Sequence, residues 1–325
     1  MIGIDVSKES LTCTYVDPVR RVPLWEQTIP NSHEGILALK KRTSGSTAWV
    51  MEPTGRFSLS VAKEARALGQ QVFIAPSRKA KQFLSSVQNR AKTDRLDSAG
   101  LALFALSRPL DAYPVKSPQV EQTDQLLSAR RGMVRAYSSL KQRQKALPYA
   151  QDALEPAISA LAAQIKALDK KIQQQVQSDP KFASAKRLEE ITGVGKTTAA
   201  AVSARLADKG FTHPDQFVAY IGLDVNVRDS GKHRGQRRLT KQGDSELRRL
   251  LYLCAQASLR AKDSPLRAQY ERELQKGLSR TAAICVVARK LAKVCWSIHT
   301  HGTNYDPNRV GKQNRPKEEN PSDSA

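Results

Sequence analysis

The sequence predicts an α/β domain followed by a mainly helical region. Short β-branched runs alternate with helical patterns over residues 1–110. A long polar helical pattern follows, and helical patterns dominate again from residue 183. The 325 residues are enough for two domains with sizeable cores. The expected segments are an α/β domain at 1–112, a helical hairpin at 113–180, a helical domain at 181–302 and a disordered tail at 303–325.

The elements of the first domain follow from local patterns. Three β-branched runs at residues 2–6, 11–16 and 22–29 predict an antiparallel meander. The segments expected next are a helix at 32–41, a strand at 48–51, a helix at 58–68 and a strand at 71–75. Three meandering strands followed by strand–helix repeats is the element order of the ribonuclease H fold. A Rossmann domain is disfavoured because the glycine fingerprint after the first strand is absent.

Residues 118–177 predict a helical hairpin with a break near Pro148. In its second half, apolar residues recur at steps of three and four, which is a short heptad seam. The members of this seam are Ile158, Leu161, Ile165, Leu168 and Ile172. The pattern fits a helix packed on its own domain as well as intermolecular coiled-coil pairing, and the hairpin is a natural element for assembly.

The helical domain begins with a pattern similar to a helix-hairpin-helix over residues 188–199. Its turn contains Gly193 and Gly195 and is followed by Lys196. Backbone N–H groups at such a helix N-terminus can hold a DNA phosphate without reading sequence. The alternative is a corner that serves only for packing.

Residues 229–243 are too rich in glycine and cations to be buried, so we expect a loop or an irregular hairpin that faces phosphate. Two arginines open the apolar helix that follows, and a further helix at 281–298 has Arg289, Lys290 and Lys293 on its polar side. The cations predicted to contact nucleic acid are Lys92, Lys196, Arg228, Lys232, Arg234, Arg237, Arg238, Lys241, Arg248 and Arg249.

The charge balance favours a polyanionic partner. Lys and Arg total 53 against 31 Asp and Glu, a formal net charge of +22. Membrane binding is disfavoured, because aromatic residues are only 6% and no basic amphipathic helix is evident. No long apolar run or signal peptide is evident either. The four cysteines lack metal or disulfide spacing and suggest reduced core residues in a cytosolic protein. The expected localisation is cytoplasmic and nucleoid-associated.

Four carboxylates form the candidate catalytic set. Asp5 and Glu52 each close an apolar run, and Asp94 and Asp97 lie three apart where a helical pattern begins. Strand ends and first helical turns are where an α/β sheet gathers reactive groups. A cluster of carboxylate oxygens suits Mg²⁺ or Mn²⁺, which can stabilise the entering and leaving oxygens of a phosphodiester. The alternative for Asp94 and Asp97 is helix capping.

Four sequence blocks in a fixed order carry a family resemblance. They are Gly3-Ile4-Asp5-Val6-Ser7-Lys8, Glu52-Pro53-Thr54-Gly55, Lys92-Thr93-Asp94-Arg95-Leu96-Asp97-Ser98 and the Ser230-Gly231 loop. Over residues 1–302 the chain resembles the DEDD transposases of bacterial insertion sequences, which are related to the Piv DNA invertases.

The resemblance implies a RuvC-like first domain and a helical transposase domain. Asp5, Glu52, Asp94 and Asp97 would bind Mg²⁺, and Ser230 would be the nucleophile that forms a phosphoserine link with DNA. The implied partners are donor and target DNA, a guide or bridge RNA, and further copies of the chain. The acidic domain of one subunit would face the serine domain of another.

Two alternatives remain open at this point. A structure-specific endonuclease acting on Holliday junctions would use only the carboxylates and a metal-activated water, so that Ser230→Ala leaves cleavage intact. A non-catalytic nucleic-acid-packaging protein would be indifferent to Asp5→Ala and to Mg²⁺.

Overall fold

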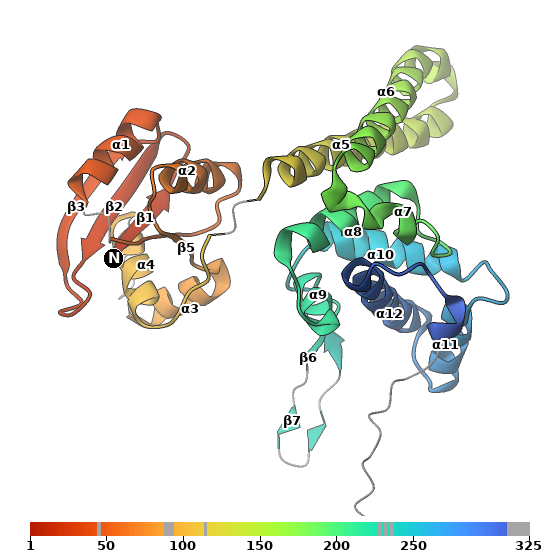
Figure 1. Cartoon of the computed structure of the whole chain (residues 1–325). Coiled ribbons are helices and arrows are strands. Elements are labelled where there is room, and N and C mark those ends of the chain that lie inside the picture. The colour runs from red at the N-terminus through yellow and green to blue at the C-terminus, as the bar shows by residue number, and fades with distance from the viewer. Residues whose placement is uncertain are drawn as a thin grey trace, which may run out of the picture. The chain divides into compact units, whose positions relative to one another are not determined.

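The computed structural model describes residues 1–43, 47–87, 94–113, 116–226, 229–230, 233–234 and 237–310. The chain divides into two compact units (Figure 1). The first is Met1–Val115, and the second begins at Lys116 and is described as far as Val310.

The first unit contains a mixed five-stranded sheet in the order β3-β2-β1-β4-β5. Its strands are β1 (Ile2–Val6), β2 (Ser10–Val16), β3 (Pro23–Pro30), β4 (Trp49–Met51) and β5 (Val72–Ile74). The first three strands are antiparallel, and β4 lies parallel to both β1 and β5. The meander and the two later strands are therefore confirmed.

Helices cover both faces of this sheet (Figure 1). They are α1 (His33–Arg42), α2 (Arg56–Ala67), α3 (Ser77–Val87) and α4 (Asp94–Leu106). Ile2 and Ile4 of β1 pack in one cluster with residues of α1 and α2, whereas Val50 packs in another with residues of α3 and α4. This separation follows from the period of two in a strand, which sends successive side chains to opposite faces.

Gly3 determines how closely α4 approaches β1. A Cβ atom at this position would lie 1.8 Å from the carbonyl oxygen of Ser98 and 2.8 Å from the backbone nitrogen of Ala102. The Ser98 hydroxyl also forms a 2.6 Å hydrogen bond with the Thr14 hydroxyl on β2. The helix therefore rests directly on the backbone of the sheet.

The second unit begins with the predicted helical hairpin. It consists of α5 (Pro118–Ala146), the short 3₁₀ helix η1 (Pro148–Ala150) and α6 (Gln151–Ser178). The break near Pro148 is confirmed. Both long helices contact each other and α8 (Lys196–Lys209), so the hairpin packs on the helical part of this unit. Ile158 and Ile172 of the heptad seam are each only 2% exposed within the single chain.

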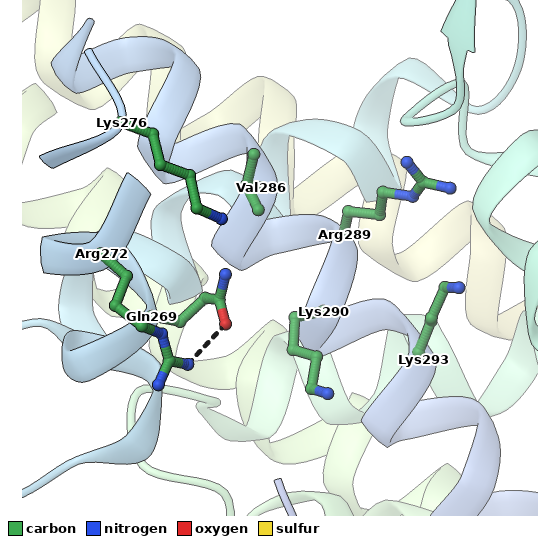
Figure 2. Close-up of a pocket in the computed structure, with 7 residues that line it drawn as sticks. All are labelled: Gln269, Arg272, Lys276, Val286, Arg289, Lys290 and Lys293. Atoms are coloured by element: carbon green, nitrogen blue, oxygen red, sulfur yellow. Dashed lines mark hydrogen bonds between the residues drawn. The ribbon is translucent and has the colours of Figure 1, made fainter. Parts of the chain in front are cut away.

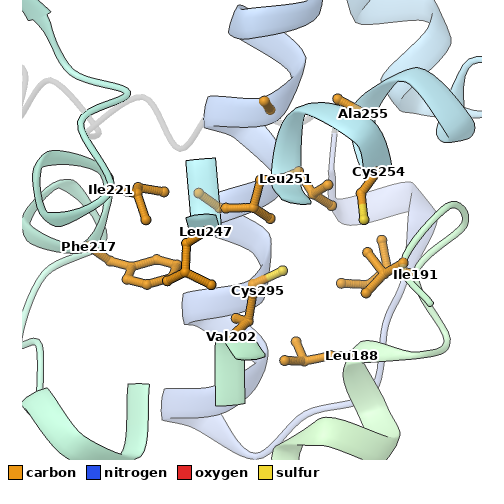
Figure 3. Close-up of a cluster of buried hydrophobic side chains, with 14 of the residues drawn as sticks. Leu188, Ile191, Val202, Phe217, Ile221, Leu247, Leu251, Cys254, Ala255 and Cys295 are labelled. Atoms are coloured by element: carbon orange, nitrogen blue, oxygen red, sulfur yellow. The ribbon is translucent and has the colours of Figure 1, made fainter. Parts of the chain in front are cut away.

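Besides α8, the second unit contains η2 (Pro180–Phe182), α7 (Ser184–Leu188), α9 (Pro214–Tyr220), α10 (Ser245–Ser258), α11 (Pro265–Gln275), α12 (Arg280–His301) and η3 (Pro307–Arg309). Helices α7 to α12 surround one apolar core (Figure 3), whereas Phe182 of η2 packs in a small separate cluster with Val120 and Ala204. Leu188, Val202, Phe217, Leu251 and Cys295 of this core are all fully buried.

Two short antiparallel ladders connect α9 to α10. β6 (Val225–Asn226) pairs with β9 (Arg238–Leu239), and β7 (Asp229–Ser230) pairs with β8 (His233–Arg234). The expectation of an irregular hairpin is confirmed for the described part of this segment.

The segment after α12 differs from the predicted disordered tail. Val310 is 7% exposed and joins the core of the second unit, and the backbone N–H of Tyr305 donates to a Glu190 carboxylate oxygen at 3.3 Å. The composition of this segment is mostly polar and therefore predicted disorder. Val310 and Tyr305 are the apolar side chains that anchor it to the second unit. Residues 311–325 lie outside the described residues.

The four cysteines are free thiols, and Cys13, Cys254 and Cys295 are buried, which agrees with reduced core residues. Burial raises the pKa of the Cys13 thiol to about 12. Among the described helices, none is both long and apolar enough to cross a membrane.

Candidate active site and nucleic-acid surface

The parallel pairing of β1 and β4 places Asp5 and Glu52 at neighbouring strand ends. Ile4 lies opposite Met51 in the last pair of this ladder; Asp5 is the next residue of β1, and Glu52 is the first residue after β4. Ile4 and Met51 belong to the cluster on the α1 and α2 face. By strand alternation, Asp5 therefore points to the opposite face, which α4 covers, whereas Glu52 lies just past the end of β4.

The direction of α4 brings its first turn toward the same end of the sheet. Leu101 and Phe104, in the second half of the helix, pack in one cluster with Met1. Because the second half of α4 lies near the start of β1, the first turn lies toward Asp5 at the end of the strand. Asp94 and Asp97 belong to this first turn. Three elements that are distant in sequence thus converge on one edge of the sheet.

The described side chains give only part of the predicted carboxylate set. Asp97 is half-buried, whereas the side chain of Asp94 and all of Lys92 lie outside the described residues. Among the described side chains, no group of three His, Cys, Asp or Glu lies close enough together to hold a metal ion. The residue types that the backbone gathers, which are carboxylates only, suit a hard cation such as Mg²⁺ or Mn²⁺.

Thr12 is a polar neighbour of this edge that the sequence reasoning missed. It lies directly opposite Asp5 in the β1–β2 pairing, is 7% exposed, and its hydroxyl is 3.5 Å from the Thr28 hydroxyl on β3. Cross-strand partners share a face of the sheet, so Thr12 lies beside Asp5 on the α4 side. The available signal was the alternation of Thr12 and Thr14 with Leu11 and Cys13 along β2.

Ser230 lies in the outer ladder of the irregular hairpin. The backbone pairing sets Ser230 opposite His233 and Asp229 opposite Arg234. Arg228, Gly231 and Lys232 lie outside the described residues. The predicted nucleophile is thus held in a short two-stranded segment with a histidine across from it.

The other cations predicted to contact nucleic acid in the hairpin and in α10 fall into two groups. Arg237, Arg238 and Lys241 are exposed where the hairpin returns toward α10. Arg248 instead donates to the backbone carbonyl of Ile221 at 2.8 Å, at the end of α9. Arg249 forms two hydrogen bonds with Glu246, at 3.0 and 2.6 Å, and these raise the pKa of its guanidinium. Arg248 and Arg249 are therefore engaged within the unit.

In the turn before α8, Gly193 packs against α10, whereas Gly195 and Lys196 are exposed to solvent. A Cβ atom on Gly193 would lie 2.6 Å from the carbonyl oxygen of Cys254 and 2.7 Å from the backbone nitrogen of Ser258, so Gly193 permits close contact with α10. Gly195, by contrast, is exposed and has no heavy atom within 4 Å of a Cβ placed on it. Lys196 is also exposed. The Gly195–Lys196 edge is the part of this turn that a phosphate could reach.

These features define an α/β first unit, in which Asp5 and Glu52 follow paired positions of β1 and β4, and a separate helical second unit. Comparison with known families agrees with this division. Residues 2–147 match a DEDD transposase family of the IS110 type, and residues 185–271 match the transposase family described as IS116/IS110/IS902.

Individual relatives carry related names. A probable family 20 transposase from Pseudomonas aeruginosa is 28% identical over 286 residues, 76% of this chain and 82% of the relative. The pilin gene-inverting protein of Moraxella bovis is 23% identical over 316 residues, 94% of this chain and 97% of the relative. A transposase for the insertion sequence element IS1328 from Yersinia enterocolitica is 30% identical over 149 residues, 45% of this chain and 43% of the relative. The chain belongs to the IS110/IS116 family of transposases.

Proposed function

We propose that this transposase of an IS110-family insertion sequence cleaves and rejoins DNA through a covalent link between Ser230 and a DNA phosphate. Asp5, Glu52, Asp94 and Asp97 would hold Mg²⁺ or Mn²⁺ at the edge of a RuvC-like sheet. The observation that carries the proposal is the convergence of Asp5, Glu52 and the first turn of α4 on one edge of the sheet. This is the placement that a carboxylate metal site on such a sheet requires.

The serine step conserves the free energy of the cleaved phosphodiester bond in a bond between serine and phosphate. The Ser230 oxygen attacks phosphorus, a bond between serine and phosphate forms, and the bond from phosphorus to one deoxyribose oxygen breaks. The serine gives up its proton, and the departing deoxyribose oxygen is released as a hydroxyl after it gains one. The reverse attack by a new DNA hydroxyl reseals the strand, so exchange needs no ATP.

The residues around Ser230 fit the demands of this step. His233 lies opposite Ser230 in the ladder, near enough in sequence and pairing to be tested as the group that accepts the serine proton. Arg234, Arg237 and Arg238 supply positive charge along the same hairpin, and developing charge on the phosphate requires such groups. The bound metal would add Lewis-acid stabilisation of phosphate oxygens.

Recognition of the DNA sequence is proposed to be delegated to a guide or bridge RNA. The protein would then contact backbone and shape, for which the cationic surface and the exposed Gly195–Lys196 edge are suited. We also propose that the active protein is an oligomer in which the acidic unit of one subunit serves the serine unit of another.

A trap for covalent linkage tests the proposed chemistry. Purified protein, its cognate RNA and labelled donor or target DNA are incubated with Mg²⁺, denatured and separated on a gel. We expect a DNA adduct with the wild-type protein and at least about a hundredfold less with Ser230→Ala or Asp94→Ala, since loss of a nucleophile or of a metal ligand removes several kcal/mol of barrier lowering. Ser178→Ala, at an exposed serine ending α6, is the matched control and should leave the adduct unchanged.

The alternatives give different gels. Cleavage without an adduct, undiminished in Ser230→Ala, would identify a hydrolytic endonuclease and contradict the serine mechanism. Absence of both cleavage and adduct in the wild-type protein, with normal DNA binding, would favour a packaging role.

A further inference from the structure

A groove between α11 and α12 combines positive charges from two helices. It has a volume of about 570 Å³, and Figure 2 shows side chains from both helices along it. Its lining residues are Gln269, Arg272, Lys276, Val286, Arg289, Lys290 and Lys293. Five of these seven side chains are cationic and none is acidic, so the groove carries an excess of positive charge.

Nearby carboxylates compensate only part of this charge. Glu273 pairs with Lys276 at 2.9 Å, and Asp215 pairs with Lys293 at 2.6 Å and with Arg289 at 3.8 Å. Arg272 donates to the Gln269 side-chain oxygen at 2.8 Å, which is a neutral partner. Within the described part of the chain, Lys290 forms no ion pair with a carboxylate.

Lys290 has the least favourable surroundings of the five cations. It is half-buried near Val286, and it lies close enough to Lys293 and Arg272 for their charges to act on it. Burial first, and then repulsion from Lys293 and Arg272, lowers the pKa of its ammonium group. An anion bound in the groove would offset the repulsion between these cations. If the same cations were fully exposed, solvent and salt would screen them and the repulsion would be small.

The spread of the charges indicates an extended anion. On α12, the cations of the lining run from Arg289 to Lys293, about 6 Å at 1.5 Å per residue, and Arg272 and Lys276 have the same spacing in sequence on the other side of the groove. One strand of a duplex carries a phosphate for about every 3.4 Å of axis, so each row of cations matches about two phosphates. A single small anion would instead require donors that converge on one point.

We propose that the groove between α11 and α12 binds the phosphodiester backbone of a nucleic-acid strand, at a surface separate from the Ser230 hairpin. Contacts there would be independent of base sequence, because the groove offers cations and one amide rather than a set of groups matched to base edges. The inference rests on the proposed function only in taking the polyanion to be nucleic acid.

The test compares two triple variants of the full chain. Arg272→Gln/Lys276→Gln/Lys290→Gln removes three groove charges and leaves the two cations that hold Asp215. Lys166→Gln/Lys181→Gln/Lys262→Gln removes three exposed charges elsewhere and is the matched control. Binding to a labelled DNA duplex and to a labelled single-stranded RNA is measured by fluorescence anisotropy over a salt series in EDTA, which prevents metal-dependent cleavage. Urea unfolding of each variant verifies that it is folded.

We expect the groove variant to bind at least about tenfold more weakly than the control variant at 0.15 M salt. The slope of log K against log salt should become shallower by up to about 2.7 for duplex DNA or about 2.1 for single-stranded RNA, which corresponds to three lost phosphate contacts. Loss restricted to DNA or to RNA identifies the strand that the groove holds. Equal affinities and slopes for the two triple variants, with both ligands, would overturn the proposal.

The outcomes are separable from those of the adduct experiment. If the groove variant binds as well as the control variant and the wild-type protein still forms the adduct, the groove proposal fails and the serine mechanism stands. Absence of the adduct in wild-type protein, with the groove variant still defective in binding, would instead contradict the proposed chemistry and retain the groove.

Discussion

At the scale of single residues, two glycines decide how closely helices approach their neighbours. Gly3 allows α4 to rest on β1, and Gly193 allows the turn before α8 to reach the backbone of α10. Gly193 also has a φ of +94°, which side-chain-bearing residues rarely adopt. These positions are fixed by space and by conformation, independently of any ligand.

Alanine substitutions distinguish packing from phosphate contact in the turn before α8. Gly193→Ala should lower the free energy of unfolding by about 2–5 kcal/mol, because it adds backbone strain and a clash with α10. Gly195→Ala, with open space around it, should cost about 1 kcal/mol or less, the scale of an N-cap change. Urea unfolding followed by circular dichroism measures both. Equal losses for the two variants would contradict the packing role assigned to Gly193.

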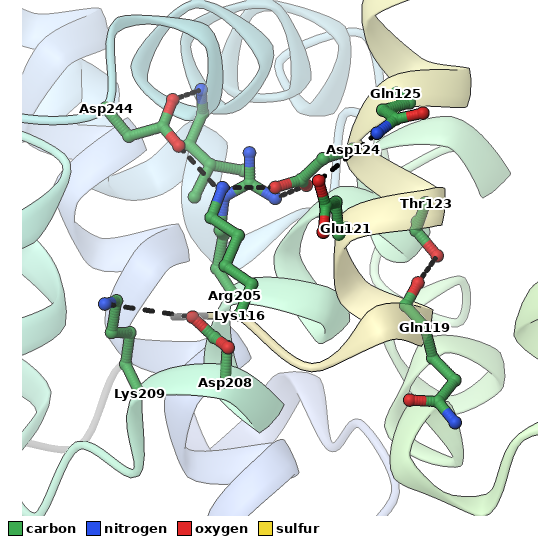
Figure 4. Close-up of polar contacts among 11 residues, drawn as sticks. Lys116, Gln119, Glu121, Thr123, Asp124, Gln125, Arg205, Asp208, Lys209 and Asp244 are labelled. Atoms are coloured by element: carbon green, nitrogen blue, oxygen red, sulfur yellow. Dashed lines mark hydrogen bonds and ion pairs between the residues drawn. The ribbon is translucent and has the colours of Figure 1, made fainter. Parts of the chain in front are cut away.

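At the scale of elements, largely buried ion pairs connect α5 to α8 and to the start of α10 (Figure 4). Arg205 of α8 pairs with Asp124 of α5 and also with Asp244, at 3.0 Å from its Nε atom. Asp244 is the N-cap of α10 and accepts two backbone N–H bonds there. Lys116 pairs with the second oxygen of Asp124. One arginine thus connects the hairpin with two helices of the core.

Removal of Arg205 should therefore be costly. Arg205→Met removes the cation that two largely buried carboxylates share and leaves only Lys116 beside Asp124, so it should destabilise the protein by about 3 kcal/mol. Lys141→Met is the control, because Lys141 lies 3.8 Å from Glu155 on the exposed side of the hairpin and should cost less than about 0.5 kcal/mol. Adding Asp124→Asn to Arg205→Met should cost less than the sum of the single changes. Strict additivity in urea unfolding would refute the coupling.

The elements themselves were largely predictable from the sequence, because their signals are local. β-branched runs marked the meander, and Pro148 marked the break between α5 and α6. The contacts that join elements were not predictable in this way. The packing of α4 on Gly3 and the pairing of Arg205 with Asp124 each join residues more than 80 positions apart, and no local pattern encodes them.

The candidate site was predicted to a similar degree. The sequence marks Asp5 and Glu52 as carboxylates near strand ends, and in the structure both directly follow the pair formed by Ile4 and Met51. Thr12 was missed because it becomes a neighbour of Asp5 only through the register of β1 with β2. Gly193 and Arg248 were predicted to contact nucleic acid, but sequence alone could not reveal that each already contacts another element of the second unit. Arg249 instead pairs with Glu246 three residues earlier on the same helix, a spacing that is visible in the sequence.

At the scale of the whole molecule, the carboxylates and the serine belong to different compact units. If one subunit supplies the carboxylates and another supplies the serine, two inactive variants should complement each other. A 1:1 mixture of Asp5→Ala and Ser230→Ala, allowed to exchange subunits, should recover about a quarter of the wild-type adduct, since half of random dimers are mixed and each contains one intact site of two.

The matched control mixes Asp5→Ala with Asp94→Ala, both in the first unit, and should remain inactive. The adduct gel measures both mixtures. Failure of the first mixture to recover activity, with exchange of subunits verified by differently tagged chains, would show that each subunit uses its own carboxylates and serine.

The two faces of β1 differ in the freedom they leave to sequence change. On the α1 and α2 face, Ile2 and Ile4 meet other side chains, and exchange among aliphatic residues of similar volume is usually tolerated at less than about 1.5 kcal/mol. On the α4 face, Gly3 meets backbone, which cannot repack around even one methyl group. Laboratory evolution of this protein should therefore diversify one side of the strand freely while position 3 remains glycine.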